Sequence, residues 1–363
     1  MDRPSVLVIG AGIVGSSVAY YLTCLKAEVH LIDRSKDPSE TTRASLGVLT
    51  HFEGGRDDYS SFYRDGHALH AELATQLADE TGIDVGWRAL GGFDLAFGDK
   101  EVDFLKQWLA VNGAKCECEW VDAQQLRSAE SQISSSVCGG VYFPHDHRVD
   151  PSALNQALRH AAVKRGAKIH LESEILHLKG DESSVSAQIR TEGGMETLWY
   201  DFVIIAAGSW TGLLSTGMNV DPSIRPIRGQ HCRYEGGEKI RHVLRWNSHY
   251  LIPSWSEIIV GATIEEVGFD LRNTESAARQ LDRIFEHLLD IKPVVTSQWS
   301  GLRPKPRKGR PVIGPIDDKE RVFIASGHYK NGVILGPITG QVVADWIVDG
   351  RPPRDMLRFG IAR

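Results

Sequence analysis

Short apolar runs alternate with amphipathic stretches along the first part of the chain. Val6–Ile9 and Val29–Ile32 are apolar runs typical of buried strands, and Ser16–Leu25 between them has a helical pattern. Apolar residues within Asp57–Thr81 also recur at helical spacing, and we expect Gly82 to end that helix. The chain therefore opens as a strand–helix–strand unit followed by a long helix.

The rest of the chain combines two kinds of pattern. Further helices are expected over Asp99–Asn112, closed by Gly113, over Asp150–Arg165 and over Gly336–Val348, and further strands over Lys168–Leu171, Tyr200–Ala206 and Phe323–Ala325. Trp87–Phe97, Arg225–Tyr234 and His249–Ala262 are rich in strand formers, and the last two, joined by long loops, favour an antiparallel sheet. This order predicts an α/β fold: a Rossmann-type nucleotide-binding domain with an inserted substrate domain of largely antiparallel β-sheet plus helices.

The expected domain bounds are 1–85, 140–215 and 300–363 for the nucleotide-binding domain, and 86–139 and 216–299 for the inserted domain. The length of 363 residues agrees with two domains of roughly 150 residues each. Apolar residues make up 42% and charged residues 24%, which excludes wholesale disorder.

Charge and cysteine usage narrow the function classes further. The net charge of −6 argues against a dedicated nucleic-acid or membrane-surface binder. No apolar run approaches ~18 residues, so we expect no membrane-spanning helix. The 5 cysteines show no framework spacing, and the first residues lack a signal-peptide pattern. These features together favour a cytoplasmic location.

A glycine fingerprint follows the first strand. Gly10, Gly12 and Gly15 form a G-x-G-x-x-G motif that opens the first helix, and Asp33 ends the second strand 18 residues after Gly15. Such a turn lets backbone approach a pyrophosphate at the helix N-terminus. An ordinary strand–helix turn is the alternative. The fingerprint leaves NAD and FAD open, and although Arg34 hints at a 2′-phosphate, Asp33 disfavours one.

A second polar cluster, His145-Asp146-His147, has residue types that bind metals. No third ligand element accompanies it, so we expect a solvated turn before the next helix and no metal site.

Several later segments, together with the glycine fingerprint, carry a resemblance. They are Thr41–Leu49, Ala206–Trp210, Tyr250–Pro253, Val260–Thr263, Trp299–Pro304 and Gly327–Gly332. Over nearly its whole length the chain resembles the D-amino-acid oxidase (DAO) family of FAD-dependent oxidoreductases, and within it glycine oxidase and the sarcosine-oxidase-like amine oxidases. The resemblance implies FAD as cofactor. It also implies non-covalent binding, because Trp299–Pro304 lacks the cysteine through which sarcosine-oxidase relatives attach their flavin.

The resemblance implies the site residues. Arg303 would bind the substrate carboxylate through its fork of donors, and Tyr250 would add a hydroxyl. A surface ion pair and a half-buried strand aromatic are the alternatives for these two residues. For the cofactor the implied set is Gly10, Ala11, Gly12, Ile13, Val14, Gly15, Asp33, Arg34, Thr41, Thr42, Arg43, Ala44, Gly47, Val48, Leu49, Ile175, Ala207, Gly208, Trp210, Gly301, Gly327, His328, Tyr329, Asn331, Gly332 and Val333.

Three positions depart from the glycine-oxidase pattern. Lys330 stands where an arginine is usual, Ile264 stands where a methionine often faces the substrate, and Ser248 replaces a frequent histidine, with His249 one place along. These changes predict a glycine-like or N-substituted glycine substrate, such as glycine, sarcosine or iminodiacetate. A second carboxylate on the substrate would meet Lys330 or the basic loop that follows Arg303.

The implied reaction is oxidation of the C–N bond by hydride transfer to flavin N5, giving an imine that hydrolyses to glyoxylate and an amine. Dioxygen would be reduced to hydrogen peroxide. The alternatives are a D-amino-acid dehydrogenase of the same fold that passes electrons to a quinone or protein, an NAD(P)-dependent dehydrogenase, and a nucleotide-binding protein without turnover. The resemblance also implies a homo-oligomer, with no nucleic-acid partner.

Overall fold

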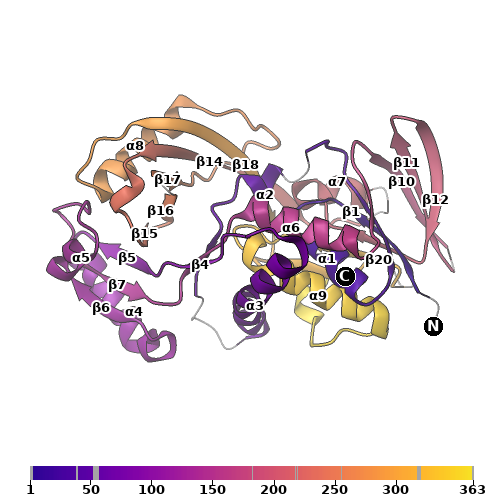
Figure 1. The fold of residues 1–363 in the computed structure, drawn as a ribbon, viewed down its shortest axis with the longest axis horizontal. Helices are drawn as coiled ribbons and strands as arrows, with labels where there is room; N and C mark the ends of the chain where they lie inside the picture. The colour runs from indigo at the N-terminus through magenta and orange to yellow at the C-terminus, as the bar shows by residue number, and fades with distance from the viewer. Residues whose placement is uncertain are drawn as a thin grey trace.

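A computed structural model describes residues 3–37, 40–51, 57–181, 183–216, 218, 220–254, 256–316 and 320–361. The fold is mixed α/β and is built on a 6-stranded and an 8-stranded sheet, with two 3-stranded sheets beside them. The two large sheets form separate lobes joined by long strands and loops (Figure 1). Within the described ranges, no helix combines the length and apolar content that a membrane crossing requires.

The six-stranded sheet has the nucleotide-binding topology that the sequence predicts. Its order is β19 (Val312–Pro315), β20 (Val322–Ser326), β13 (Phe202–Ile205), β1 (Ser5–Ile9), β2 (Glu28–Ile32) and β9 (Lys168–His170). Neighbouring strands are parallel from β20 to β9, and only the edge strand β19 pairs antiparallel.

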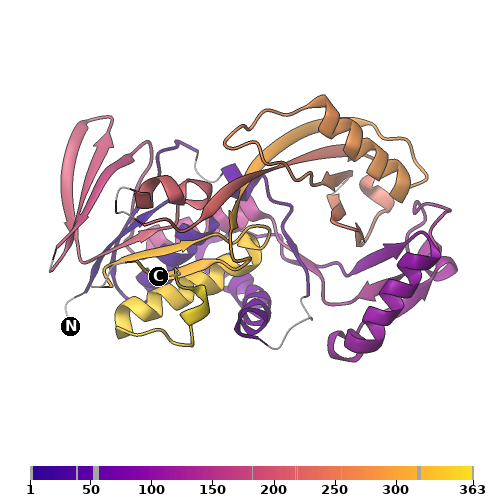
Figure 2. The ribbon, with the colours of Figure 1, turned by 180° about the vertical axis from the view of Figure 1, so that it is seen from behind.

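Alternate residues of these strands face two different layers. Val6 and Val8 of β1 belong to the core beneath helices α1 (Ile13–Cys24), α3 (Asp58–Thr81), α6 (Pro151–Lys164) and α9 (Gly332–Asp349). Leu7 and Ile9 face the opposite layer, a sheet of β10 (Glu174–Gly180), β11 (Val185–Thr191) and β12 (Gly194–Tyr200). This sheet lies at the far end of the molecule from the other lobe (Figures 1 and 2). Both faces of the parallel sheet are therefore covered, as continuous apolar strands require.

The eight-stranded sheet forms the second lobe and is largely antiparallel. Its order is β18 (Val295–Pro306), β14 (Ile224–Glu235), β17 (Glu257–Gly261), β16 (His249–Ser254), β15 (Val243–Trp246), β5 (Gly92–Ala96), β7 (Gly139–Phe143) and β6 (Glu119–Asp122). Leu281, Phe285 and Leu288 of α8 (Glu275–Leu288) share its core with Leu126 of α5 (Ala123–Ala129). The remaining elements are α2 (Glu40–Arg43), β3 (Val48–Leu49), β4 (Arg88–Ala89), α4 (Asp99–Cys116), β8 (His147–Arg148), η1 (Gly208–Trp210), α7 (Thr211–Thr216), η2 (Gly237–Lys239) and η3 (Leu357–Phe359).

The structure confirms the predicted fold class and the long helix that ends at Gly82, where φ is 75°. The prediction that Gly113 closes the next helix is wrong, because α4 continues to Cys116. A β-carbon at Gly113 would lie 2.8 Å from Leu109 Cδ1, so this glycine serves close packing inside the helix. The helix ends instead at Glu117, which takes the left-handed conformation. The division into domains at the bounds given above stays a prediction.

Other predicted boundaries shift by a few residues. The first helix begins at Ile13 and the last at Gly332, each one turn earlier than predicted. The stretch Trp87–Phe97 breaks into two strands at Gly91, whose φ is 65°, and His249–Ala262 breaks into β16 and β17. Such breaks follow from turns that alternation alone does not reveal.

The prediction that His145-Asp146-His147 forms a solvated turn is also wrong. Asp146 is completely buried and forms an ion pair with Arg245 Nη1. Its Oδ1 accepts a hydrogen bond of 2.9 Å from the backbone N–H of His51. The carboxylate is thus an internal link between the loop after β7 and strand β15.

Candidate active site

A cavity of about 260 Å³ lies at the carboxyl ends of the parallel strands. Gly10 after β1, Asp33 after β2, Ala207 after β13 and His328 after β20 all line it. Parallel sheets bind nucleotides at this edge, because strand ends and helix N-termini meet there. The cavity thus lies where the glycine fingerprint predicts it.

Asp33 holds the glycine loop in place. Its Oδ2 accepts a hydrogen bond of 2.8 Å from the N–H of Ala11, and its Oδ1 accepts one of 2.9 Å from the N–H of Ser35. Gly10 has a φ of 103°, and a β-carbon there would lie 2.6 Å from the carbonyl oxygen of Ala206. Both the positive φ and this close approach require glycine at position 10.

The cavity fits the diphosphate of FAD at two glycines. A β-carbon at Gly12 would meet only Thr42 Oγ1, at 3.5 Å, and one at Gly208 would meet no atom within 4 Å, although both glycines line the cavity. The space beside their backbone is therefore open to a ligand. Helix α1 starts directly after Gly12 with no acidic residue in its first turn. The N–H of Ile13 donates to Thr42 Oγ1 at 3.1 Å, and the positive helix end suits an anion.

Planar and apolar groups line another part of this cavity. The guanidinium of Arg34 lies 4.5 Å from the centre of the Trp210 ring. Both residues line the cavity, as does Ile175. Such surfaces suit the adenine and isoalloxazine rings that FAD carries.

A second cavity of about 150 Å³ adjoins the first. Thr41, Ser45, Tyr329 and Val333 line both. The second cavity also contains all of Arg303, Tyr250 and Lys330, the main residues predicted to bind substrate. No aspartate or glutamate is among the described residues that line it. Its charged groups are therefore cationic, which suits a carboxylate ligand.

Arg303 on β18 is fixed by its backbone neighbours. Its Nη1 donates a hydrogen bond of 3.1 Å to the carbonyl oxygen of Thr263. On the adjacent strand β14, a β-carbon at Gly229 would overlap the guanidinium, so the glycine provides the space that the side chain occupies. Burial lowers the pKa of Arg303, but the guanidinium remains charged at neutral pH.

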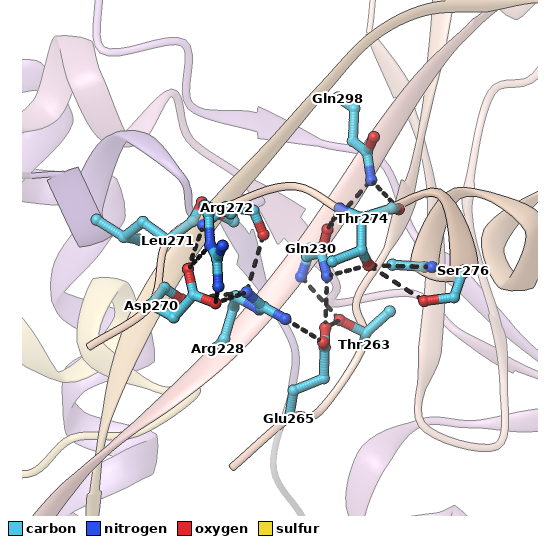
Figure 3. Close-up of polar contacts among 12 residues, drawn as sticks. Arg228, Gln230, Thr263, Glu265, Asp270, Leu271, Arg272, Thr274, Ser276 and Gln298 are labelled. Atoms are coloured by element: carbon cyan, nitrogen blue, oxygen red, sulfur yellow. Dashed lines mark hydrogen bonds and ion pairs between the residues drawn. The ribbon is translucent and has the colours of Figure 1, made fainter. Parts of the chain in front are cut away.

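Thr263 is in turn held by the polar network in Figure 3. Its Oγ1 donates to Glu265 Oε1 at 2.5 Å and accepts from the N–H of Gln230 at 2.9 Å. Arg228 Nη2 donates to Glu265 Oε2 at 2.7 Å, and the Arg228 side chain is 4% exposed. Burial alone would raise the pKa of Glu265, but the hydrogen bonds from Arg228, Thr263 and Gln230 outweigh it and lower the pKa.

Tyr250 and Lys330 have opposite pKa shifts. Burial raises the pKa of Tyr250, and the nearby carboxylates Asp94 and Asp146 raise it further against the effect of Arg245. Its hydroxyl therefore stays protonated and can donate a hydrogen bond. Lys330 is exposed as a residue, but partial desolvation of its ammonium and the positive charge of Arg303 lower its pKa, which is consistent with the two cations lying near one another.

Sequence reasoning missed His231, which lines the second cavity. Its ring stacks on Trp299 at a centroid distance of 5.5 Å, and its buried Nδ1 has no partner within the described structure. Burial, with a smaller effect of Arg303, lowers its pKa to about 3, so the imidazole is neutral at pH 7. A polar residue in the predicted strand Arg225–Tyr234 is the signal that would have indicated it. Ser45, Leu46, Thr50, Ala262 and Ile334 also line this cavity and were not named as site residues, whereas Ser248, noted as a departure from the family pattern, does line it.

Most residues predicted to hold the cofactor line one of the two cavities. The first contains Gly10, Gly12, Ile13, Val14, Asp33, Arg34, Thr41, Thr42, Ile175, Ala207, Gly208, Trp210, His328, Tyr329, Gly332 and Val333, and the second adds Ala44, Gly47, Val48, Gly301 and Asn331. Ala11, Gly15, Leu49 and Gly327 are buried without lining either cavity. Their cofactor roles, like those of the lining residues, stay predictions.

Three other predicted site residues lie elsewhere. Arg43 forms an ion pair with Asp37 and lines a neighbouring groove. Ile264 is 47% exposed and lines neither cavity. His249 also lines neither, and its neighbour Ser248 occupies the cavity wall instead.

Comparisons with known proteins agree with this architecture. The chain matches the family model described as FAD dependent oxidoreductase (DAO) over residues 5–346. It is 28% identical over 359 residues to a glycine oxidase of Bacillus subtilis (strain 168), covering 97% of this chain and 95% of that protein. The crystal structure of glycine oxidase from Geobacillus kaustophilus has a TM-score of 0.91 at 25% identity, covering 100% of this chain and 99% of that one. Iminodiacetate oxidase from Chelativorans sp. has the same fold, with a TM-score of 0.87 at 23% identity over 98% of both chains.

Proposed function

Because the chain belongs to the DAO family of FAD-dependent oxidoreductases, we propose that it is an oxidase of small glycine-like or N-substituted glycines. Glycine, sarcosine and iminodiacetate represent this class. The proposal depends chiefly on Arg303, a half-buried guanidinium in a cavity directly beside the FAD cavity, where no described lining residue is acidic. When bound, FAD would supply two-electron oxidation of the substrate, and the two electrons would then reduce dioxygen to hydrogen peroxide.

The FAD would be held by the glycine loop and by Gly208, whose backbone leaves open space, and by the N-terminus of α1. Asp33 would keep that loop in its binding conformation through the N–H of Ala11. In FAD enzymes of this topology the acid after the second strand also bonds a ribose hydroxyl.

The substrate carboxylate would form a bidentate pair with Arg303, for which one bond, from Nη1, is recorded among the described residues, and would receive a further hydrogen bond from the Tyr250 hydroxyl. The cavity of about 150 Å³ would hold the substrate directly beside the flavin. Fixing the carboxylate at one end presents the C–N bond in a defined direction, which is the main contribution of positioning to the rate. The imine product would hydrolyse to glyoxylate and an amine.

The residues that line the substrate cavity also bear on which protonation state of the substrate amine reacts. No carboxylate among the described residues faces the substrate cavity, and the pKa of His231 is lowered to about 3 by burial. The reaction would therefore proceed from the fraction of substrate whose amine is already neutral. Catalysis would depend on orientation more than on a protein base.

Anaerobic mixing of the FAD-loaded protein with glycine, sarcosine and iminodiacetate tests the proposal. The flavin absorbance near ~450 nm is expected to bleach and, on admission of air, to recover with release of peroxide. Bleaching that air does not reverse would instead assign a dehydrogenase that uses another acceptor. An absence of bleaching with every substrate would overturn the proposed function.

A further inference from the structure

We infer that the preferred substrate carries a second carboxylate on its nitrogen, bound by Lys330 while Arg303 binds the first. This inference rests on the oxidation of glycine-like substrates proposed above, because glycine has no side chain and a second acidic group must then be an N-substituent. The preferred class is thus dicarboxylic secondary amines rather than glycine itself. Lys330 would be a specificity-determining residue.

The polar network next to the second cavity is balanced in charge within itself, and so it does not cancel the positive charges of the cavity. Behind Thr263, Arg228 forms ion pairs with Glu265 at 2.7 Å and with Asp270 at 3.2 Å, and Asp270 also pairs with Arg272 at 2.9 Å. These two acids and two arginines balance each other. Glu265 acts on Arg303 only as a lesser effect than burial, because its carboxylate is already paired with Arg228.

The two lysines beside the cavity differ in whether a carboxylate pairs with them. Lys305 lies 3.7 Å from Glu266 and so has a carboxylate partner. No carboxylate in the described part of the chain pairs with Lys330, although its charge lies close enough to lower the pKa of His249, after the larger effect of burial. Among the described residues that line the cavity, Arg303 and Lys330 are consequently two positive charges with no carboxylate beside them.

Two like charges in one small cavity repel each other, and a ligand relieves this repulsion in proportion to the negative charge it brings. A glycine-like substrate brings one carboxylate, which Arg303 would occupy. Lys330 is exposed on the wall of the same cavity and so remains available to an acidic group beyond the substrate nitrogen. A dicarboxylate would thus pair both cations, whereas glycine and sarcosine would leave Lys330 unpaired.

Two unreactive ligands test this inference by affinity alone. Diglycolate and methoxyacetate share an ether oxygen in place of the amine, so neither forms an imine, and only diglycolate has two carboxylates. Isothermal titration of the FAD-loaded protein at low salt is expected to show that diglycolate binds about tenfold tighter, the gain typical of one hydrogen bond to a charged group. Lys330→Gln is expected to remove most of this difference.

Lys305→Gln is the matched control, because it removes a neighbouring lysine that already has a carboxylate partner. It is expected to preserve the preference for diglycolate, and Arg303→Lys is expected to weaken both ligands. Flavin absorbance and circular dichroism would check that each variant is folded and loaded.

Equal affinity for the two ligands in the unmodified protein would overturn the inference, as would equal loss of preference in Lys330→Gln and Lys305→Gln. Failure of diglycolate to bind would overturn it as well. These outcomes are separate from those of the proposed function: amine-driven bleaching with equal affinities refutes the second carboxylate alone. Selective diglycolate binding without bleaching by any amine refutes the oxidase alone.

Discussion

Arg303 donates a hydrogen bond from Nη1 to the carbonyl oxygen of Thr263 at 3.1 Å, so backbone from one loop fixes the orientation of a side chain on β18. Gly229 on the adjacent strand leaves the space in which the same guanidinium lies. An arginine held in this way loses little freedom when a carboxylate binds. The site would therefore hold its proposed anion-binding group in place before substrate arrives.

Gly229→Ala is expected to raise KM for the amine substrate by about tenfold or more, because displacing Arg303 removes a charge-assisted hydrogen bond. The added methyl group would overlap the guanidinium, and the side chain would have to leave its position. Steady-state kinetics of the FAD-loaded variant would measure this. Gly98→Ala is the control, since a β-carbon there meets no atom within 4 Å. An unchanged KM in Gly229→Ala would refute the positioning argument.

Glu265→Gln is expected to loosen the position of Arg303 indirectly, through Thr263. The substitution weakens the ion pair with the buried Arg228 and the hydrogen bond from Thr263, so the loop that supplies the Thr263 carbonyl loosens. We expect a rise in KM of about fivefold with a smaller change in kcat, and a loss of about 1–3 kcal/mol in the free energy of unfolding.

The shorter acid in Glu265→Asp should restore part of both losses, because the charge is kept. Urea unfolding and KM measured on the same preparations would separate stability from positioning. A large fall in kcat with KM unchanged would contradict a role through Arg303.

The sequence predicts those parts of the site that depend on local backbone geometry. Gly10, Gly12 and Asp33 belong to one strand–turn–helix unit, whose spacing alone determines that they meet. Family motifs add Arg303 and Tyr250, which the structure brings into one cavity although they lie on β18 and β16. Short motifs therefore locate the cavity and its charged group.

The rest depends on which distant segments become neighbours. Asp146 meets Arg245 only because β7 and β15 both flank β5 in one sheet. No sequence pattern near either residue predicts this ion pair. An aspartate between two histidines is instead typical of an exposed turn. His231 was missed for the same reason, since burial against Trp299 follows from strand register.

Two neighbouring glycine substitutions are expected to separate cofactor binding from folding. In Gly12→Ala the new methyl group enters open cavity space, so FAD affinity should fall by about tenfold or more while apoprotein stability is retained. In Gly15→Ala the methyl group would overlap the carbonyl oxygen of Gly10, so the free energy of unfolding should fall by about 2 kcal/mol or more. Fluorescence titration with FAD and urea unfolding of the apoproteins measure the two effects. Equal loss of stability in both variants would contradict this division.

The buried histidines predict that acid destabilises the fold. Burial lowers the pKa of His70 to about 4, and burial followed by the neighbouring histidines lowers that of His67 to about 4. An unfolded histidine titrates near ~6.5, so between about pH 6.5 and pH 4 the unfolded chain binds more protons than the folded one. The free energy of unfolding should therefore fall as the pH decreases through this window, with most of the loss complete near pH 4.

Each fully buried histidine contributes a slope of up to about 1.4 kcal/mol per pH unit in that window. His70 is 1% exposed, and its Nε2 lies 3.2 Å from the carbonyl oxygen of Ile334, so His70→Leu removes one such group. Urea unfolding from pH 7 to pH 4.5 should show a shallower pH dependence in this variant, even though its stability at pH 7 is lower. The exposed His177→Leu should leave the slope unchanged. If both variants keep the full slope, the acid sensitivity comes from groups other than His70.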